Sequence, residues 1–190
     1  MEINTKIKEI QEQAYDTAVK QGLYAENIED NNLISRIIEE MYEMVDAFNK
    51  CNIADVKRFN KRMNRKLFKP TFVKAYDKYI KNTVQDEVAD VILLISSFFQ
   101  HRGIELTGEI QGIDWHRDFS KHSIYENAFA FTKNATRGYR KGGIPLTLAE
   151  RLNFLFAYIV KWGETLGVDV ERYVELKLKY NINRSYLHRE

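Results

Sequence analysis

The sequence predicts an all-α fold, most simply a helical bundle. Only two prolines, Pro70 and Pro145, interrupt the 190 residues, so there is room for long helices. Apolar residues recur along most of the chain at the three- and four-residue spacing of amphipathic helices, and no run shows the alternating pattern of a strand. With 44% hydrophobic residues, the chain can bury a core as a single domain over residues 1–190.

Capping residues mark several of the expected helix starts. Thr83 and either Asn31 or Asn32 suit N-caps, because their side chains can accept a hydrogen bond from a free N–H of the first turn. Thr147 and Glu150 have the spacing of a capping box. Together with the apolar periodicity, these signals predict helices at residues 4–21, 31–50, 53–66, 71–80, 84–102, 121–136, 147–166 and 169–181.

Glycines mark helix ends and also indicate an internal repeat. Gly22 and Gly103 suit the position just after a helix C-terminus. The stretch FFQHRGIEL around Gly103 is similar to KWGETLGVDV around Gly167, and each follows a long amphipathic segment. This similarity suggests a duplicated, pseudo-dimeric chain with halves at residues 1–110 and 120–190. Chance similarity between two generic helical hairpins is the alternative.

Composition restricts the classes of partner and location. The net charge of +2 gives no general electrostatic support for a nucleic-acid partner. Residues 57–69 carry only basic charges, which fits either a solvated helix face or an arm that helps to hold a polyanion. The single cysteine, Cys51, excludes an intrachain disulfide and fits a reducing cytosol. Because the longest apolar run, residues 91–99, is too short to span a bilayer, we expect a soluble, cytoplasmic protein with no membrane partner.

Two pairs of carboxylates border the apolar stripes of two expected helices. Glu40 and Glu43 lie roughly 90° and 150° from the middle of the first stripe. Glu87 and Asp90 lie at similar angles, roughly 80° and 140°, from the middle of the second. Residues three apart occupy adjacent turns of one face, so each pair can direct two carboxylates at a common centre. If the helices pack by their stripes, the four acidic groups converge.

A convergent group of carboxylates favours a metal site. Like charges raise one another's pKa unless a cation neutralises them, and ligands that are all oxygen favour Mg²⁺ or Mn²⁺. Either pair alone indicates only an ordinary surface feature, because Glu-x-x-Glu is common on solvated helix faces. The doubling of the arrangement with a matched offset is what favours the metal site.

A basic segment near the C-terminus suits phosphate. A lysine supplies a point charge, an arginine supplies a two-pronged donor, and asparagine and tyrosine supply neutral donors. A cationic helix end that complements its own macrodipole would have the same composition, and this second interpretation is the commoner one. The residues concerned are Lys177, Lys179, Tyr180, Asn181 and Arg184.

Three segments, in this order, carry a resemblance to a known family. They are LISRIIEEMYEMVDAF (residues 33–48), DEVADVILLISSFFQHRGIEL (residues 86–106) and GVDVERYVELKLKYNINRSYLH (residues 167–188). They resemble the Glu-x-x-Glu helix, the Glu-x-x-Asp helix and the closing Lys-Leu-x-Tyr-Asn run of the MazG-like nucleoside triphosphate pyrophosphohydrolases, whose superfamily also contains the dimeric dUTPases. The chain departs from that pattern, because residues 51–80 look inserted and the closing run follows only after a long intervening stretch.

The resemblance implies a MazG-like four-helix core that hydrolyses a ribo- or deoxyribonucleoside triphosphate to the monophosphate and pyrophosphate. It implies Mg²⁺, with Mn²⁺ as a substitute, held by Glu40, Glu43, Glu87 and Asp90. It also implies that Lys177, Asn181 and Arg184 contact the triphosphate, with Lys179 and Tyr180 as further candidates. Glu39 and Glu40 are the candidate catalytic residues, although the helical angle of Glu39 points away from the stripe.

The departures suggest a fused pair, in which the first half keeps the acids and the second half keeps the basic tail. Such a chain would have one active site where a family dimer has two. That the chain itself forms a homodimer is a further hypothesis.

Other functions are left open by the residues alone. A ferritin-like di-metal oxidase normally requires Glu-x-x-His pairs, and none of the four histidines has a glutamate three positions before it. A catalytically degenerate module that binds a nucleotide or a protein partner is the main alternative, and the retention of all four acids argues against it. A nucleic-acid binder would depend on residues 57–69, and its affinity would fall steeply with salt.

Overall fold

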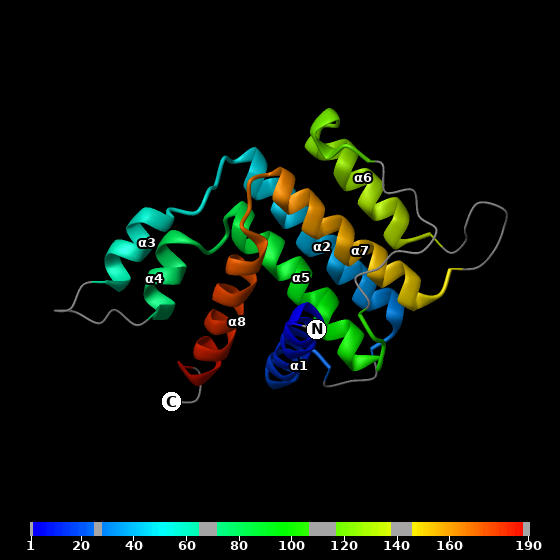
Figure 1. Cartoon of the computed structure of the whole chain (residues 1–190), viewed down its shortest axis with the longest axis horizontal. Helices are drawn as coiled ribbons and strands as arrows, with labels where there is room; N and C mark the ends of the chain where they lie inside the picture. The colour runs from blue at the N-terminus through cyan, green and yellow to red at the C-terminus, as the bar shows by residue number, and fades with distance from the viewer. Residues whose placement is uncertain (1, 25–27, 65–71, 107–116, 138–145, 188–190) are drawn as a thin grey trace.

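The computed structural model describes residues 2–24, 28–64, 72–106, 117–137 and 146–187. Within these ranges the chain is helical and contains no strand, which confirms the predicted all-α class (Figure 1). The helices are α1 (Glu2–Lys20), α2 (Asp30–Asn49), α3 (Val56–Met63), α4 (Phe72–Tyr79), α5 (Val84–His101), α6 (Ile124–Ala135), α7 (Leu148–Thr165) and α8 (Val170–Leu187), with a short 3₁₀ turn, η1 (Phe119–Lys121).

Helix α5 is the centre of the molecule. It packs against α1, α2, α7 and α8, and nearly all of its side chains are buried. A helix that is apolar on most of its circumference needs neighbours on several sides, and these four helices supply them. Polar groups on such a helix are therefore held among neighbouring elements, and this is how the acidic residues of α5 are positioned.

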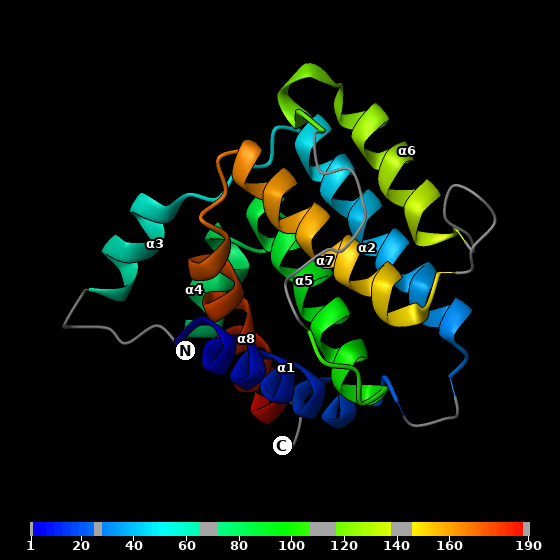
Figure 2. The same ribbon diagram turned by 45° about the vertical axis from the view of Figure 1, so that its right-hand side comes forward.

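Four helices form two pairs that lie against each other (Figure 2). One pair is α2 with α5, and the other is α6 with α7. They meet through contacts of α2 with α6 and of α5 with α7. The approach of α7 to α5 is close at Gly163, where an added Cβ would lie 2.9 Å from Cγ1 of Val88. A side chain at this position would clash with Val88, so the contact between the two helices would have to shift.

The remaining helices cover the central bundle on one side. Helices α1 and α8 both pack on α5 and touch each other. Helices α3 and α4 pack together as a hairpin, and α4 leans on α8 (Figures 1 and 2). This hairpin is the segment that looked inserted in the sequence. Its near end is tied to the bundle, because the backbone N–H of Ala54 donates to Oε1 of Gln85.

The capping predictions are mostly confirmed. Thr83 caps α5 by accepting from the N–H of Asp86, and Thr147 with Glu150 forms the capping box of α7. The expected cap at Asn31 or Asn32 is wrong, because the cap position of α2 is Glu29, two or three residues earlier, and no side-chain hydrogen bond forms there. The last helix runs on to Leu187, beyond the predicted end at residue 181.

The two helices of the suggested repeat, α5 and α7, have the same length and similar ends. Helices α5 and α7 each span 18 residues, and each starts after a capping threonine. Gly103 and Gly167 follow them with positive φ values of 61° and 78°. These features suit an ungapped overlay of the two segments, which sets Arg151 opposite Glu87 and Phe154 opposite Asp90. Because any two capped helices of equal length would match in this way, the duplication stays a hypothesis.

No helix among the described residues is long and apolar enough to cross a lipid bilayer. Residues 65–71 of the apparent insertion, residues 138–145 and His188 lie outside the described residues.

Candidate metal and phosphate site

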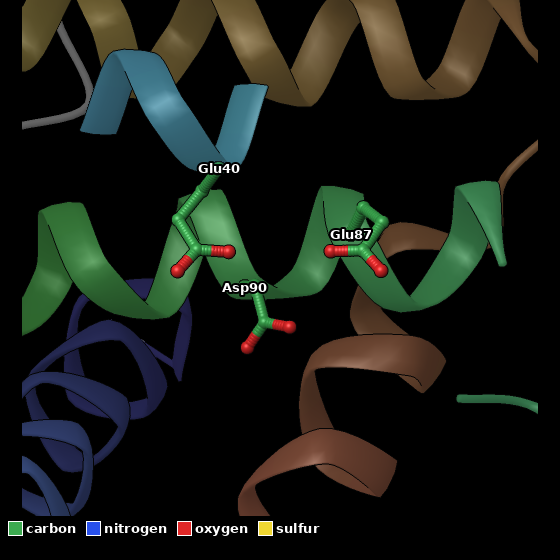
Figure 3. A group of neighbouring side chains, drawn as sticks. All are labelled: Glu40, Glu87 and Asp90. Carbon is green, nitrogen blue, oxygen red and sulfur yellow. The ribbon is translucent and has the colours of Figure 1, made fainter. Parts of the chain in front are cut away.

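Three carboxylates from two helices converge at one point (Figure 3). Glu40 reaches down from α2, and Glu87 and Asp90 project from α5. One oxygen atom from each of the three lies within 4.8 Å of the others. The packing of α2 on α5 by their apolar stripes produces this convergence, as the helical angles predict. We call Glu40, Glu87 and Asp90 the acidic cluster.

The fourth predicted ligand lies apart from the acidic cluster. Glu43 is exposed on α2, and it is not among the carboxylates that approach one another within 4.8 Å. Its charge still acts on the site, because it raises the pKa values of both Glu40 and Glu87. Among the described residues, the structure thus brings together three of the four predicted ligands and leaves Glu43 at the rim.

Crowding and burial change the protonation of the acidic cluster. Burial, followed by the charge of Asp90, raises the pKa of Glu40 to about 7. The same two causes raise the pKa of Glu87 to about 8. Burial also raises the pKa of Asp90, although the adjacent ammonium of Lys177 opposes that rise. Carboxyl groups that titrate near neutrality lack sufficient positive charge around them, which is the electrostatic condition that a divalent cation relieves.

Lys177 of α8 is the cation that the chain itself supplies. Its Nζ lies 2.5 Å from Oδ2 of Asp90 and 2.8 Å from Oδ1 of Asp86. Burial alone would lower the pKa of Lys177, but Asp90 and Asp86 together raise it above its ordinary value. Lys177 is therefore charged, and it forms a buried ion pair with one member of the acidic cluster.

Asp86 is a site residue that no sequence pattern singled out. It is only 1% exposed and accepts three hydrogen bonds. The Tyr76 hydroxyl donates at 2.6 Å, the Asn82 backbone N–H at 2.8 Å and Lys177 Nζ at 2.8 Å. The available signal was the spacing of Asp86 and Asp90, which are four residues apart and so share a helix face. Tyr76 gave no signal, because it belongs to the apparent insertion.

A cavity of about 990 Å³ opens beside the acidic cluster, between α1, α2, α5 and α8. Glu40 and Asp90 form part of its wall, so the cavity reaches the acidic cluster. Glu39 also lines it, although it points away from the apolar stripe. Gln21 and Arg36 are polar lining residues that the sequence analysis did not single out. The volume is at the upper end of the range for small-molecule pockets.

Residues of the basic tail divide between the cavity and other surroundings. Asn181 lines the cavity, and its Oδ1 is buried with no hydrogen-bond partner among the described residues. Such an acceptor is suited to a donor from a ligand or water. Arg184 lies with its guanidinium carbon 5.5 Å from the centre of the Tyr180 ring, and its charge lowers the pKa of Asp90. Both residues thus belong to the neighbourhood of the site.

The two less certain tail candidates are directed elsewhere. Tyr180 is buried against Tyr76, with ring centres 4.3 Å apart, and its hydroxyl donates to Asp77 at 2.6 Å. Lys179 is exposed on another side of α8, with Nζ 4.8 Å from the centre of the Phe72 ring. Neither side chain lines the cavity beside the acidic cluster. Tyr180 thus links α8 to α4 through Tyr76 and Asp77, and Lys179 lies over Phe72 of α4.

Comparison of the chain with protein-family models, with curated proteins and with solved structures gives no match. The function must therefore be argued from the chemistry of the site.

Proposed function

We propose that this protein is a Mg²⁺-dependent nucleoside triphosphate pyrophosphohydrolase that converts a ribo- or deoxyribonucleoside triphosphate to the monophosphate and pyrophosphate. The observation that carries the proposal is the acidic cluster at the wall of a large cavity, with Lys177 and Asn181 of α8 beside it. This combination supplies groups for a cation and for a polyphosphate in one place.

The residues present fit a hard divalent cation. All three members of the acidic cluster offer carboxylate oxygens, which Mg²⁺ and Mn²⁺ prefer. The raised pKa values of Glu40 and Glu87 indicate excess negative charge that such an ion would compensate. Glu40, Glu87 and Asp90 would hold the ion, which would supply charge neutralisation for the phosphate oxygens.

The reaction that we propose consumes one water molecule. The water oxygen bonds to the α-phosphorus, the bond from the α-phosphorus to the bridging oxygen breaks, and pyrophosphate leaves with that oxygen. The residues of this chain would orient the groups and move the proton. Glu39 lines the cavity next to Glu40, so we assign it as the group that accepts the proton from water. Lys177 and Arg184 would stabilise the negative charge that develops on the leaving group.

One observation favours a second candidate function. Lys177 already pairs with Asp90 in a buried ion pair, so one carboxylate of the acidic cluster has a cation without any metal. A degenerate module that binds a nucleotide without cleaving it would keep the cavity and this ion pair. The two functions differ in their response to metal, because the module needs none.

Release of pyrophosphate from a panel of ribo- and deoxyribonucleoside triphosphates with Mg²⁺ tests the proposal. Wild type should release pyrophosphate from at least one of them, and Glu40→Gln and Asp90→Asn should be at least about 100-fold slower. Glu43→Gln is the matched control and should retain most of the activity, because Glu43 lies outside the acidic cluster. No release by wild type, together with binding of a triphosphate that does not depend on Mg²⁺, would establish the degenerate module instead.

A further inference from the structure

Asp86 is held from three directions by groups that belong to separate parts of the chain. Tyr76 comes from α4, Asn82 from the turn before α5, and Lys177 from α8. A buried carboxylate that accepts several hydrogen bonds is fixed in place. Asp86 is therefore held rigidly next to Glu87 in the sequence, yet it is not a member of the acidic cluster.

Two stacked aromatic rings lie near Asp86 and Lys177. Tyr76 stacks on Tyr180 with an interplanar angle of 17°, and both rings are almost wholly buried. Nζ of Lys177 lies 5.9 Å from the centre of the Tyr76 ring and 5.6 Å from that of Tyr180. The ammonium thus lies close to both aspartates and to both rings. The whole Lys177 side chain is buried.

The charges have a consequence for metal binding. Lys177 pairs with Asp90, and Asp90 is also a member of the acidic cluster. A divalent cation in that cluster repels the ammonium and competes for the Asp90 carboxylate. Without another anchor, Lys177 would leave when the metal arrives. Asp86 is such an anchor, because its contact with Lys177 does not involve the carboxylates of the acidic cluster.

We propose that Asp86 is a positioning residue that keeps Lys177 in the site while the acidic cluster holds a divalent cation, so that metal and ammonium act on the phosphate groups together. An ammonium has three N–H donors, and Asp86 and Asp90 accept from two of them. In this proposal the third would donate to a phosphate oxygen. This role rests on the proposed pyrophosphohydrolase function.

A spectroscopic test follows the ammonium itself and needs no turnover. In protein labelled with ¹⁵N-lysine, Lys177 should give a slowly exchanging ammonium signal, which is identified by its absence in Lys177→Met. In wild type this signal should persist when Mg²⁺ saturates the protein. In Asp86→Asn it should be present without metal and should disappear with saturating Mg²⁺. Persistence of the signal in Mg²⁺-saturated Asp86→Asn would overturn the proposal.

The same measurement on wild type guards against a variant that fails to fold. Loss of the Lys177 signal from wild type on saturation with Mg²⁺ would overturn the proposal without any substitution. Asp46→Asn is the matched control, because Asp46 also pairs with a lysine, Lys50, but on the exposed surface of α2. Asp46→Asn should leave the Lys177 signal unchanged, both with and without Mg²⁺.

Kinetic measurements then separate positioning from metal binding. Asp86→Asn should lower kcat by about tenfold or more, whereas the affinity for Mn²⁺, measured by electron paramagnetic resonance, should change far less. A loss of Mn²⁺ affinity as large as the loss of kcat would make Asp86 part of the metal site and overturn the proposal. If wild type releases no pyrophosphate, the proposed function fails, but the ammonium signal still decides whether Asp86 retains Lys177.

Discussion

The ammonium of Lys177 on α8 lies 2.5 Å from the carboxylate of Asp90 on α5, and both side chains are largely withdrawn from solvent. The chain thus carries an internal cation at the point where its sequence predicts a metal. If the acidic cluster binds a metal as we propose, this ion pair would couple metal binding to stability, and that coupling can be measured.

Removal of the internal cation should destabilise the protein in a manner that metal reverses. Lys177→Met leaves Asp86 and Asp90 buried without their partner, and breaking a buried pair in this way costs about 3 kcal/mol. Urea unfolding at neutral pH should show this loss of unfolding free energy, and saturating Mg²⁺ should restore part of it. Lys50→Met removes an exposed lysine with 62% of its side chain accessible, and its effect should be close to zero.

Stability without metal should fall as the pH rises through neutrality. The pKa values of Glu40 and Glu87 are raised from 4.5 to about 7 and about 8, so the folded state binds more protons than the unfolded state between these limits. The unfolding free energy therefore decreases with rising pH across that window. Thermal unfolding between about pH 5 and pH 9 measures the slope, which Glu40→Gln with Glu87→Gln should flatten. A rise of stability with pH in wild type would contradict this assignment.

Divalent cations should bind more tightly as the pH rises, and their binding should stabilise the fold. Ligand carboxyl groups must lose their protons before they coordinate a metal, so binding below about pH 8, the pKa of Glu87, releases protons. Mg²⁺ at about 100 times its Kd should add about 2.7 kcal/mol to the unfolding free energy. Asp90→Asn should abolish this gain. Glu43→Gln should keep it, and an equal loss in both variants would place Glu43 among the ligands.

Close contact between α5 and α7 should make Gly163 intolerant of a side chain. An added Cβ would lie 2.9 Å from Cγ1 of Val88, the residue next to Glu87. Gly163→Ala should therefore lower the unfolding free energy by about 1–3 kcal/mol, as overpacking does. In a double-mutant cycle, Val88→Ala should recover part of that loss by removing the clashing methyl groups. Additive effects of the two substitutions would contradict this prediction, because they would show that the clash with Val88 is not the cause of the loss.

Helical angles predicted the central part of the site well. The stripes of α2 and α5 decide how the two helices pack, and this packing brings Glu40 to Glu87 and Asp90. The angles alone do not separate Glu43 from the acidic cluster, because Asp90 lies at a similar angle on its own helix. Asp90 faces Lys177 of α8, whereas Glu43 is exposed on α2. Spacing separates the tail, because Asn181 and Arg184 follow Lys177 by four and seven residues and share its face, whereas Lys179 does not.

The parts that sequence could not predict depend on tertiary contacts between distant segments. Lys177 was expected to contact a triphosphate, but its pairing with Asp86 exists only because α8 crosses α5. Tyr76 reaches the site from a hairpin that no periodic pattern links to it. The cap at the start of α2 failed for a local reason, since Glu29 takes that position without a side-chain hydrogen bond.

The pairing of Asp86 with Lys177 joins positions 91 residues apart, and this separation has a consequence for biosynthesis. At about 5–20 residues per second, a ribosome needs roughly 5–18 s after making Asp86 to make Lys177. During that interval α2 and α5 exist without the helix that neutralises their acids and closes one side of α5. Until α8 is synthesised, the mutually repelling carboxylates therefore lack the ammonium of Lys177, and protons or dissolved cations can compensate them in its place.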